Sequence, residues 1–351
     1  RIVPKLKVPT TVNQPLDDEP ALLVSGRTLH MRQYEAPSEP AVAIEDDNII
    51  LNAYVKSPGL SPSDVLIRTD KWLKLLDLPQ MMPQSRITAS LWDLIKWNEE
   101  SLIEDSTQLR GKPRPKVAGA YHCVNDDDVW IGEDVKLEPG CVLDATKGPV
   151  VIADHARIGA NSVLYGPCYI GPYAEIRAVS LIRPGTSIGS MSRIGGEVSN
   201  SIVFGYSNKS HDGYLGDSYV GKWVNLGAGT TTSNLKNTYG EISMKIGTRE
   251  IPTGRRNLGS LIGDHTKTAI LTRLMTGSYV GFCSMLAGSN LPPRFVPSYT
   301  YWTDKGAEKY RMDKAIEVTR RVFARRDRPV TEVDEEVMRY VEKTAPGIEN
   351  V

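Results

Sequence analysis

The chain has 351 residues, of which 40% are hydrophobic, enough for a sizeable core in one large domain or two ordinary ones. Its 42 lysines and arginines equal its 42 aspartates and glutamates. Because no net charge draws the chain to a polyanion, we expect neither nucleic acid nor a membrane surface as its partner. A charged ligand must therefore be held by a local cluster of side chains.

Cysteine usage and the lack of a targeting segment indicate a cytoplasmic protein. Four cysteines, Cys123, Cys141, Cys168 and Cys283, lie far apart without a CxxC pair, which argues against a zinc knuckle and a dense disulfide framework. No stretch approaches about 18 consecutive apolar residues or resembles a signal peptide. The chain begins with Arg1 rather than methionine, so we expect a segment to precede it.

Residues 1–118 are expected to form part of an α/β domain followed by a linker. The runs PALLVSG (20–26) and NIILNAYV (48–55) are typical of strands, and SLWDLIKWNEESLIEDS (90–106) is typical of a helix. Prolines and glycines in QLRGKPRPKVAG (108–119) indicate the linker.

From residue 152 onward an aliphatic side chain returns every six positions, which neither a helix nor a simple strand explains. A coil with three short flat faces per turn does explain it, with the aliphatic side chain pointing inward and a small residue often following at the corner. The positions are Ile152, Ile158, Leu164, Ile170, Ile176, Ile182, Ile188 and Ile194. The same spacing occurs at Ile131, Leu137 and Leu143, at Val220 and Leu226, and, with two imperfect members, at Ile262, Thr268, Leu274, Val280 and Leu286. We therefore expect a mainly β chain with a hexapeptide-repeat solenoid over residues 119–292.

Two stretches break this period, residues 195–217 (GGEVSNSIVFGYSNKSHDGYLGD) and 230–260. Stacked repeats tolerate insertions only at corners, so both stretches are expected to project outward. Residues 293–351 are expected to form a helical extension with helices at 305–328 and 331–344. The arginines between 320 and 328 are typical of a solvated helix face, with a contact to CoA or another phosphate as the alternative.

His211 is the candidate catalytic residue. Polar residues surround it in the sequence, and a histidine in such a stretch can accept a proton from an amine or hydroxyl nucleophile near neutral pH. A surface histidine in a polar loop is the alternative reading of the same pattern. No two of the five histidines are close in sequence, which argues against a zinc-dependent carbonic anhydrase, and we expect no metal site.

Asn225 and Asn234 flank a segment of small residues at 227–229. Their amides suit a sugar or an acyl carbonyl, and the glycines let a ligand approach the backbone closely. A tight corner of the solenoid is the alternative, which needs the glycines but not the asparagines.

The segments LIRPGTSIG, HDGYLGD and VNLGAGTTTSN together resemble the acetyltransferase half of the bifunctional bacterial enzyme that makes UDP-N-acetylglucosamine. Residues 195–240, GDHTKT and YRMDKAIEVTRRVFARR resemble more closely the divergent branch of that family, described as related sugar nucleotidyltransferases. The resemblance covers residues 85–348 well and the N-terminal part weakly. It implies a left-handed parallel β-helix that forms a homotrimer with active sites between neighbouring subunits.

The resemblance also implies roles for single residues. His211 matches the general base that deprotonates the amine of glucosamine 1-phosphate for attack on acetyl-CoA. Positions that bind the sugar phosphate or the acetyl group are matched by Arg183, Tyr214, Asn225 and Asn234. Positions along acetyl-CoA are matched by Ala228, Asp264 and Ala287.

One departure from the family pattern concerns the sugar phosphate. Ser199 stands where the bacterial enzyme has a phosphate-binding lysine. Lys209 or Lys236 is the candidate to replace that lysine, and we assign Lys209 to substrate binding.

The sequence therefore favours an acetyl-CoA-dependent N-acetyltransferase that acts on an amino sugar phosphate in nucleotide-sugar biosynthesis. One alternative is a sugar-1-phosphate nucleotidyltransferase, which would require Mg²⁺ and in which the β-helix mainly trimerises the protein. Residues 1–118 contain no glycine-rich phosphate loop, so no catalytic residue is assigned there. A non-enzymatic assembly scaffold is the other alternative.

Overall fold

The structure is a computed structural model that describes residues 120–349 without a gap, and before them residues 21–24, 28–30, 38–45, 49–56, 74–81 and 85–109. The chain forms two compact units, residues 1–93 and residues 94–351. Each unit has buried apolar side chains of its own.

Short antiparallel strands make up most of what is described in the first unit. A three-stranded sheet has the order β1 (Ala21–Val24), β4 (Ile49–Val55) and β3 (Ala41–Glu45), and β2 (Thr28–His30) pairs with β5 (Ser85–Ile87). A 3-10 helix, η2 (Lys74–Asp77), lies between β4 and β5 in the chain. Strands β1 and β4 confirm the two strands expected at 20–26 and 48–55.

Helix α3 (Leu91–Ser106) confirms the helix expected at 90–106. The carboxylate of Asp93 accepts hydrogen bonds from the backbone N–H groups of Ala89 at 3.0 Å and Ser90 at 2.8 Å. A carboxylate in the first turn that reaches back in this way satisfies N–H groups that would otherwise lack a partner. The sequence around Ser90 therefore sets where the helix begins.

Further along α3, where the helix already belongs to the second unit, one side chain bonds it to the solenoid of that same unit. The amide of Asn98 donates to the carbonyl of Gly185 at 2.7 Å and accepts from the hydroxyl of Ser187 at 2.9 Å. A 3-10 helix, η3 (Thr107–Leu109), follows α3. Most of the expected linker, residues 110–119, lies outside the described residues.

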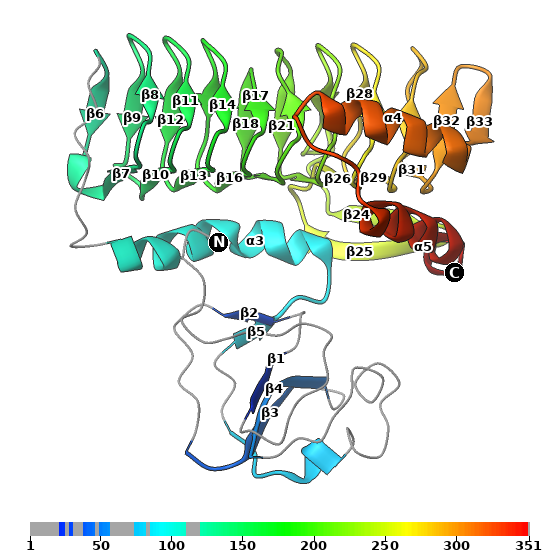
Figure 1. Cartoon of the computed structure of the whole chain (residues 1–351), viewed down its shortest axis with the longest axis horizontal. Coiled ribbons are helices and arrows are strands. Elements are labelled where there is room, and N and C mark those ends of the chain that lie inside the picture. The colour runs from blue at the N-terminus through cyan, green and yellow to red at the C-terminus, as the bar shows by residue number, and fades with distance from the viewer. Residues whose placement is uncertain are drawn as a thin grey trace. The chain divides into compact units, whose positions relative to one another are not determined.

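The second unit is dominated by a parallel β-helix in which each turn contributes a short strand to each of three sheets (Figure 1). The first sheet consists, in order, of β31 (Phe295–Val296), β29 (Ser278–Val280), β26 (Ser260–Ile262), β22 (Tyr219–Val220), β19 (Ile202–Val203), β16 (Thr186–Ile188), β13 (Cys168–Ile170), β10 (Val150–Ile152) and β7 (Val129–Ile131). The second sheet consists of β20 (Asn208–Lys209), β17 (Arg193–Ile194), β14 (Glu175–Ile176), β11 (Arg157–Ile158) and β8 (Lys136–Leu137), and farther along the coil of β27 (Lys267–Thr268), β30 (Met285–Leu286), β32 (Thr300–Thr303) and β33 (Gly306–Lys309). The third sheet consists of β21 (Tyr214–Gly216), β18 (Glu197–Ser199), β15 (Leu181–Ile182), β12 (Val163–Tyr165), β9 (Val142–Asp144) and β6 (His122–Val124), and on its side β23 (Thr231–Thr232) pairs with β28 (Arg273–Leu274). A 3-10 helix, η4 (Asp126–Asp128), precedes β7.

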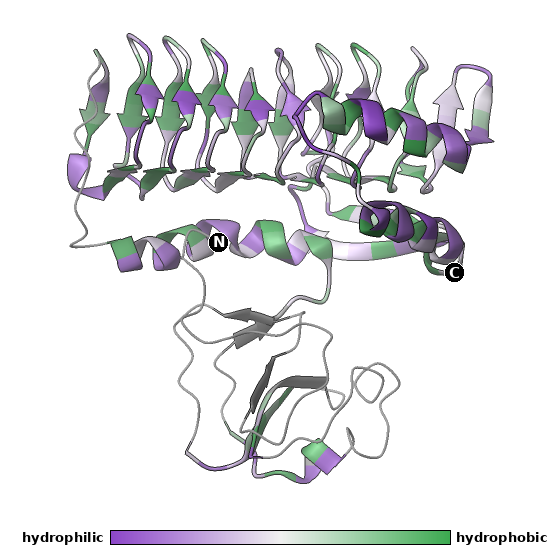
Figure 2. Cartoon of the chain, in the orientation of Figure 1, coloured by the Kyte–Doolittle hydropathy of each residue, from purple (hydrophilic) through white to green (hydrophobic). Residues whose placement is uncertain are grey.

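The interior of the β-helix confirms the six-residue period. All eight aliphatic side chains from Ile152 to Ile194 are at most 2% exposed and belong to one hydrophobic cluster. Strand register stacks them: Ile158 pairs with Ile176, and Ile176 pairs with Ile194, each 18 residues further on. Hydrophobic segments accordingly return turn after turn (Figure 2). Each turn buries its inward residues against the turns on either side, which is how repeat folds obtain a continuous core.

The structure corrects the expectation that residues 195–217 form an outward insertion. Strands β18 to β21 in this stretch pair in register with the preceding turn, so the stretch belongs to the solenoid. The turn is shorter instead, because Ile188 pairs with Val203 only 15 residues further on. The period fails here because the corners lose residues, not because the chain leaves the coil.

The second break, at 230–260, does contain an insertion. Val220 pairs with Ile262, so 42 residues separate strand positions that are 18 apart in an ordinary turn. Strands β24 (Ile242–Ile246) and β25 (Arg249–Arg255) form an antiparallel hairpin separate from the three sheets. Ile242 and Met244 are fully buried, so the hairpin packs against the protein instead of extending freely into solvent.

The C-terminal segment adds strands and two helices. Strand pairing continues through β31 and β32, past residue 292. The helix expected at 305–328 begins later, because β33 pairs antiparallel with β32 first, and α4 spans Met312–Ala324. Helix α5 (Glu332–Glu349) confirms the second expected helix and extends it through Pro346.

Helix α4 packs on a row of aromatic side chains at the corner between the first and second sheets. Phe323 is 1% exposed and stacks on Trp223 with ring centroids 4.0 Å apart, and Trp223 stacks on Tyr206 at 4.2 Å. The guanidinium of Arg328 lies 5.6 Å from the centre of the Tyr206 ring. Stacked aromatic rings and a cation over a ring each add to the area that the helix buries. These aromatic contacts keep Arg326 and Arg328, which follow α4, beside the second sheet.

Candidate active site

The corner between the second and third sheets, which we call the pocket corner, is hollowed where the short turn lies. In an ordinary turn the inward residue Ile176 is followed by Ile182 after six positions, whereas Val198 follows Ile194 after four. Gly195 and Gly196 make this short corner, and the missing residues leave a cavity of about 380 Å³. A Cβ on Gly195 would lie 2.6 Å from the carbonyl oxygen of Ser210, so only glycine lets the two turns approach here.

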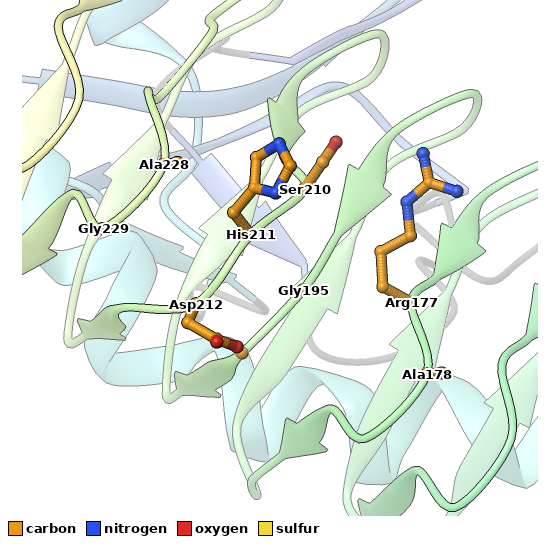
Figure 3. A pocket seen from close by; sticks show the side chains of 9 residues that line it. Arg177, Ala178, Gly195, Ser210, His211, Asp212, Ala228 and Gly229 are labelled. Atoms are coloured by element: carbon orange, nitrogen blue, oxygen red, sulfur yellow. The ribbon is translucent and has the colours of Figure 1, made fainter.

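His211 stands at the next turn, on the edge of this cavity. Its imidazole and the guanidinium of Arg177 project from corners two turns apart, with the corner of Gly195 between them (Figure 3). The His211 side chain is exposed, and no residue in the described part of the chain hydrogen-bonds to its imidazole. Both ring nitrogens are thus free for a ligand, which a general base requires.

Other groups around the cavity add one cation and two polar side chains. Arg177 is held by Glu175, whose Oε2 lies 2.9 Å from Nη1. Ser210 and Asp212 come from the same short segment as His211, and Ala228 comes from the following turn. The cavity therefore offers a base, a hydroxyl and charges of both signs within one corner.

Lys209 lies beneath the floor of the cavity and not within it. Its side chain is 2% exposed and occupies the inward position next to Ile194 in the second sheet. Nζ donates to the carbonyl of Gly195 at 2.6 Å and to the carbonyl of His211 at 3.0 Å. Burial lowers the pKa of Lys209 to about 8, against a smaller upward effect of Asp212. In this position Lys209 does not present its ammonium to a ligand in the cavity.

A polar cluster covers the third sheet immediately after the His211 corner. The side-chain amide of Asn234 donates to the hydroxyl of Tyr214 at 3.1 Å and to the carboxylate of Asp217, which also accepts from Asn200 at 2.6 Å. Burial, and secondarily the negative charge of Asp217, raise the pKa of Tyr214. The structure thus brings together two of the predicted substrate-binding residues, Tyr214 and Asn234.

Arg183 belongs to the same sheet, where its Nε is paired with Glu197. Ser199, which stands where the resemblance implies a lysine, lies in β18 on the same sheet and pairs with Gly216. Lys236, the other candidate for that lysine, donates to the backbone carbonyl of Glu241 within the insertion. Among the described residues, neither Lys209 nor Lys236 places its ammonium beside Ser199.

Asn225 lies on the outer face of the second sheet, away from Tyr214 and Asn234. Its Oδ1 lies 3.5 Å from Nδ2 of Asn208, whose own oxygen accepts a hydrogen bond from Arg326 at 2.9 Å. Arg193 follows along the same face, 3.6 Å from the carboxylate of Glu175. Arg177 and Arg193 therefore share one carboxylate, that of Glu175, and Arg326 adds a third guanidinium on Asn208, an excess of positive charge that suits an anion.

The predicted acetyl-CoA positions separate in the structure. Ala228 lines the cavity with His211. Ala287 lies on the pocket corner but three turns beyond Ser210. Asp264 lies at the corner between the first and second sheets, where its Oδ1 accepts the N–H of Lys222 at 2.9 Å. That bond caps a turn of the solenoid, as Asp304 does for the N–H of Ser289 at 2.8 Å, so Asp264 has a structural role in its present place.

Sequence reasoning missed Arg177, Ser210 and the double glycine of the cavity. Two signals were present in the sequence. An arginine follows Ile176 where a glycine follows several other inward residues, and the inward positions Ile194 and Val198 are only four apart. The first marks a side chain at a corner that is otherwise kept small, and the second marks the short corner itself.

Two kinds of site are absent from the part of the chain that the structure describes. No group of three or more histidine, cysteine, aspartate or glutamate side chains converges as a metal site would require. No described helix is long and apolar enough to cross a bilayer.

The fold and the hollowed corner define a hexapeptide-repeat β-helix protein, and comparisons with known proteins narrow this class. The sequence is 29% identical over 263 residues to the bifunctional sugar-1-phosphate nucleotidylyltransferase/acetyltransferase of Sulfurisphaera tokodaii, covering 67% of this chain and 66% of that protein. It is 35% identical over 159 residues to the bifunctional protein GlmU of Azoarcus sp., covering 38% of this chain and 31% of that protein. The chain thus spans less than two thirds of the length of either relative.

A solved structure of Arabidopsis UDP-N-acetylglucosamine acyltransferase is similar with a TM-score of 0.34 and 12% identity, over 57% of this chain and 75% of that chain. No protein-family profile matches the chain. The two sequence relatives confirm the resemblance: the chain is similar, at the modest identity of a divergent branch, to proteins named as bifunctional, one of them for sugar-1-phosphate nucleotidyl transfer and acetyl transfer.

Proposed function

We propose that the chain is an acetyl-CoA-dependent N-acetyltransferase acting on an amino sugar phosphate in nucleotide-sugar biosynthesis. The observation that carries this proposal is the exposed imidazole of His211, which none of the described residues hydrogen-bonds, at the edge of a cavity that Arg177 and Ala228 also line. A free imidazole beside a cation is the arrangement that deprotonation of an ammonium-bearing, phosphorylated substrate needs.

In the proposed reaction the amine nitrogen of the sugar attacks the carbonyl carbon of the acetyl thioester. The N–C bond forms and the C–S bond breaks, so the acetyl group passes from sulfur to nitrogen. His211 takes the proton that the nitrogen loses and passes it to the departing thiolate, which leaves as free CoA thiol. The products are the N-acetylated sugar phosphate and CoA.

Substrate recognition is proposed for the residues that flank the cavity on either side. Arg183, Tyr214 and Asn234 on the third sheet supply a guanidinium, a hydroxyl and an amide for the sugar phosphate. On the other side, Arg193 and Asn225 of the second sheet, with Arg326 after α4 bonded to Asn208 of that sheet, would face the phosphates of the acyl donor.

Acetyl-CoA is proposed to run along the pocket corner from Ala228 toward Ala287. Three turns separate Ser210 from Ala287, which corresponds to about 14 Å at the usual strand spacing of about 4.8 Å. An extended acetyl-CoA molecule can span this distance. Asp264 would reach the donor only from another corner or another subunit. The proposed enzyme is a cytoplasmic homotrimer, and light scattering would test the trimer by measuring the molar mass of the protein in solution.

The test follows free thiol while acetyl-CoA and glucosamine 1-phosphate are both present. His211→Ala is expected to lower turnover by a factor on the order of 10² to 10⁴, the usual contribution of a general base. His122→Ala is the matched control, because His122 is also exposed but lies in β6, far along the coil from the cavity. Equal turnover in the wild-type and His211→Ala proteins would remove the base assignment.

A nucleotidyltransferase remains the second candidate, because the relative from S. tokodaii carries both activities in its name. In that case sugar nucleotide would form from a nucleoside triphosphate, Mg²⁺ and a sugar 1-phosphate, with no thiol released. A pure assembly scaffold would give neither product, and substitution of His211, Tyr214 or Asn234 would then disturb subunit assembly instead of turnover.

A further inference from the structure

Lys209 occupies a position where the other turns place an apolar or hydroxyl side chain. On the second sheet the inward residues before it are Leu137, Ile158, Ile176 and Ile194, all buried. Lys209 continues this row and is itself 2% exposed. A lysine has therefore entered the core of the β-helix directly beneath the candidate active site.

This placement is costly for stability. A buried ammonium loses its hydration, and no carboxylate among the residues described hydrogen-bonds to it. Burial accordingly lowers the pKa of Lys209 to about 8. An aliphatic residue such as those in the neighbouring turns would fill the same space without that cost. The lysine therefore calls for an explanation other than packing.

In other turns, hydroxyl side chains at the pocket corner donate the hydrogen bonds that the ammonium of Lys209 donates here. In the turn of Ile176, the carbonyl of Arg177 accepts hydrogen bonds from the hydroxyls of Ser162 at 2.8 Å and Ser180 at 2.6 Å. Farther along, the carbonyl of Ala269 accepts from the hydroxyl of Thr272 at 2.9 Å. Each of these carbonyls follows an inward residue of the second sheet, so corner hydroxyls are a recurring device of this coil.

The short corner cannot use this device. Gly195 is the residue equivalent to Arg177, and Gly196 follows it without a hydroxyl. In the next turn Gly213 stands where Ser180 and Thr272 stand in theirs, and a Cβ there would lie 2.1 Å from the carbonyl oxygen of Thr230. Lys209 supplies a donor from inside the coil instead: its Nζ bonds the carbonyl of Gly195, the equivalent of Arg177, and also the carbonyl of His211 in the next turn.

We propose that Lys209 is a positioning residue that fixes the backbone of the His211 corner from within the core. One ammonium bonds the carbonyls of two successive turns, those of Gly195 and His211, and so sets how far the His211 segment stands from the cavity floor. The inference rests on the proposed function for its catalytic consequence, but its structural content concerns the His211 backbone alone. It also replaces the expectation that Lys209 binds the sugar phosphate.

The test compares Lys209→Met with the matched control Ile194→Met, an equally buried position in the same row. Methionine fills the volume of lysine without a donor, so Lys209→Met is expected to fold and to melt no lower than the wild-type protein. Its kcat for thiol release is expected to fall at least tenfold, with both KM values within about twofold of wild type. Amide hydrogens of residues 210–214 are expected to exchange faster in Lys209→Met and unchanged in Ile194→Met.

The following results would contradict the inference. A kcat equal to that of Ile194→Met would show that the bonds from Lys209 do not position His211, while the proposed function would stand. A raised KM for the sugar phosphate at unchanged kcat would show that Lys209 binds substrate. If the wild-type protein releases no thiol, the proposed function fails, and hydrogen exchange at residues 210–214 decides the inference by itself: unchanged exchange refutes it.

A second variant guards against a folding failure. Lys209→Gln keeps a neutral N–H donor on a shorter side chain, which cannot bridge both carbonyls at the observed distances. If Lys209→Met does not fold, Lys209→Gln takes its place in the same comparison. A lowered kcat with faster exchange at residues 210–214 is expected, and wild-type values for both would refute the inference.

Discussion

A single buried carboxylate organises the polar cluster on the third sheet. Asp217 is 6% exposed and has φ of 46°, a left-handed conformation that aspartate and asparagine tolerate better than most side chains. Its two oxygens accept the amides of Asn200 and Asn234, and Asn234 in turn holds Tyr214. Burial and the charge of Asp217 raise the pKa of Tyr214, so its hydroxyl remains protonated and able to donate to a ligand at neutral pH. The geometry of two proposed sugar-binding residues therefore depends on a residue that touches no ligand.

Asp217→Asn tests this dependence with little change of shape. The new amide places an N–H₂ group against one of the two donors that Asp217 now accepts, so one buried hydrogen bond is lost. We expect the free energy of unfolding to fall by about 1–3 kcal/mol, measured by urea denaturation. Asp134→Asn is the matched control, since Asp134 also has a left-handed φ of 52° but a side chain that is 78% exposed. Equal losses in the two variants would mean that the cluster contributes nothing specific.

At the scale of elements, the sequence predicted the repeated parts of the coil better than its exceptions. The eight inward positions from Ile152 to Ile194 were predictable because burial in stacked turns demands an aliphatic residue at each. Residues 195–217 were mistaken for an insertion because a lost corner residue shifts the period just as a loop does. Lys209 could not be assigned to the core, because a charged side chain normally faces solvent and only the coordinates reveal the carbonyls that receive it. The hydrogen-bonded cluster of Tyr214 and Asn234 likewise depends on Asp217, which ends the HDGYLGD motif but was assigned no role from the sequence.

Helix α4 rests partly on a histidine that the fold keeps neutral. The ring of His265 lies 6.0 Å from that of Phe323 and nearly parallel to it. Burial first, and the positive charge of Lys267 second, lower the pKa of His265 to about 3, and its Nδ1 is buried without a hydrogen-bond partner among the residues described. Since the unfolded chain has a histidine pKa near about 6.5, this group contributes stability that is complete above that pH. The contribution is lost as pH falls from about 6.5 toward about 3, because the unfolded chain then binds the proton more readily.

His265→Phe should remove this acid sensitivity while keeping an aromatic ring under α4. We expect the unfolding free energy of the wild-type protein to fall relative to that of the variant by up to about 1.4 kcal/mol for each pH unit below about 6.5. Denaturant titrations at several pH values between 7 and 4 measure the difference directly. Two parallel stability curves would show that His265 does not titrate on unfolding in this range.

The whole chain is divided into two compact units, and the proposed site residues lie in only one of them. Strands β1 to β5 lie in the unit of residues 1–93, with Val42, Ala43 and Ala53 fully buried there. The β-helix has its own continuous core, and every proposed site residue from Arg183 to Ala287 lies in the unit of residues 94–351. Because each turn of a repeat fold is stabilised by its neighbours, the second unit has what it needs to fold without the first. The proposed acetyl transfer is then expected to need only the second unit, and nucleotidyl transfer, the second candidate function, is expected to need the first.

A shortened chain of residues 88–351 tests this division and keeps the Ser90 and Asp93 cap of α3. We expect it to fold, to melt within a few degrees of the full chain, and to release thiol from acetyl-CoA at a similar rate in the presence of glucosamine 1-phosphate. The full chain with His211→Ala is the control for background thiol release. A folded but inactive 88–351 chain would show that acetyl transfer needs residues 1–87, and a chain that aggregates would show that the β-helix core does not suffice. Thermal unfolding followed by circular dichroism, run beside the thiol assay, separates these two failures because only the second removes the cooperative transition.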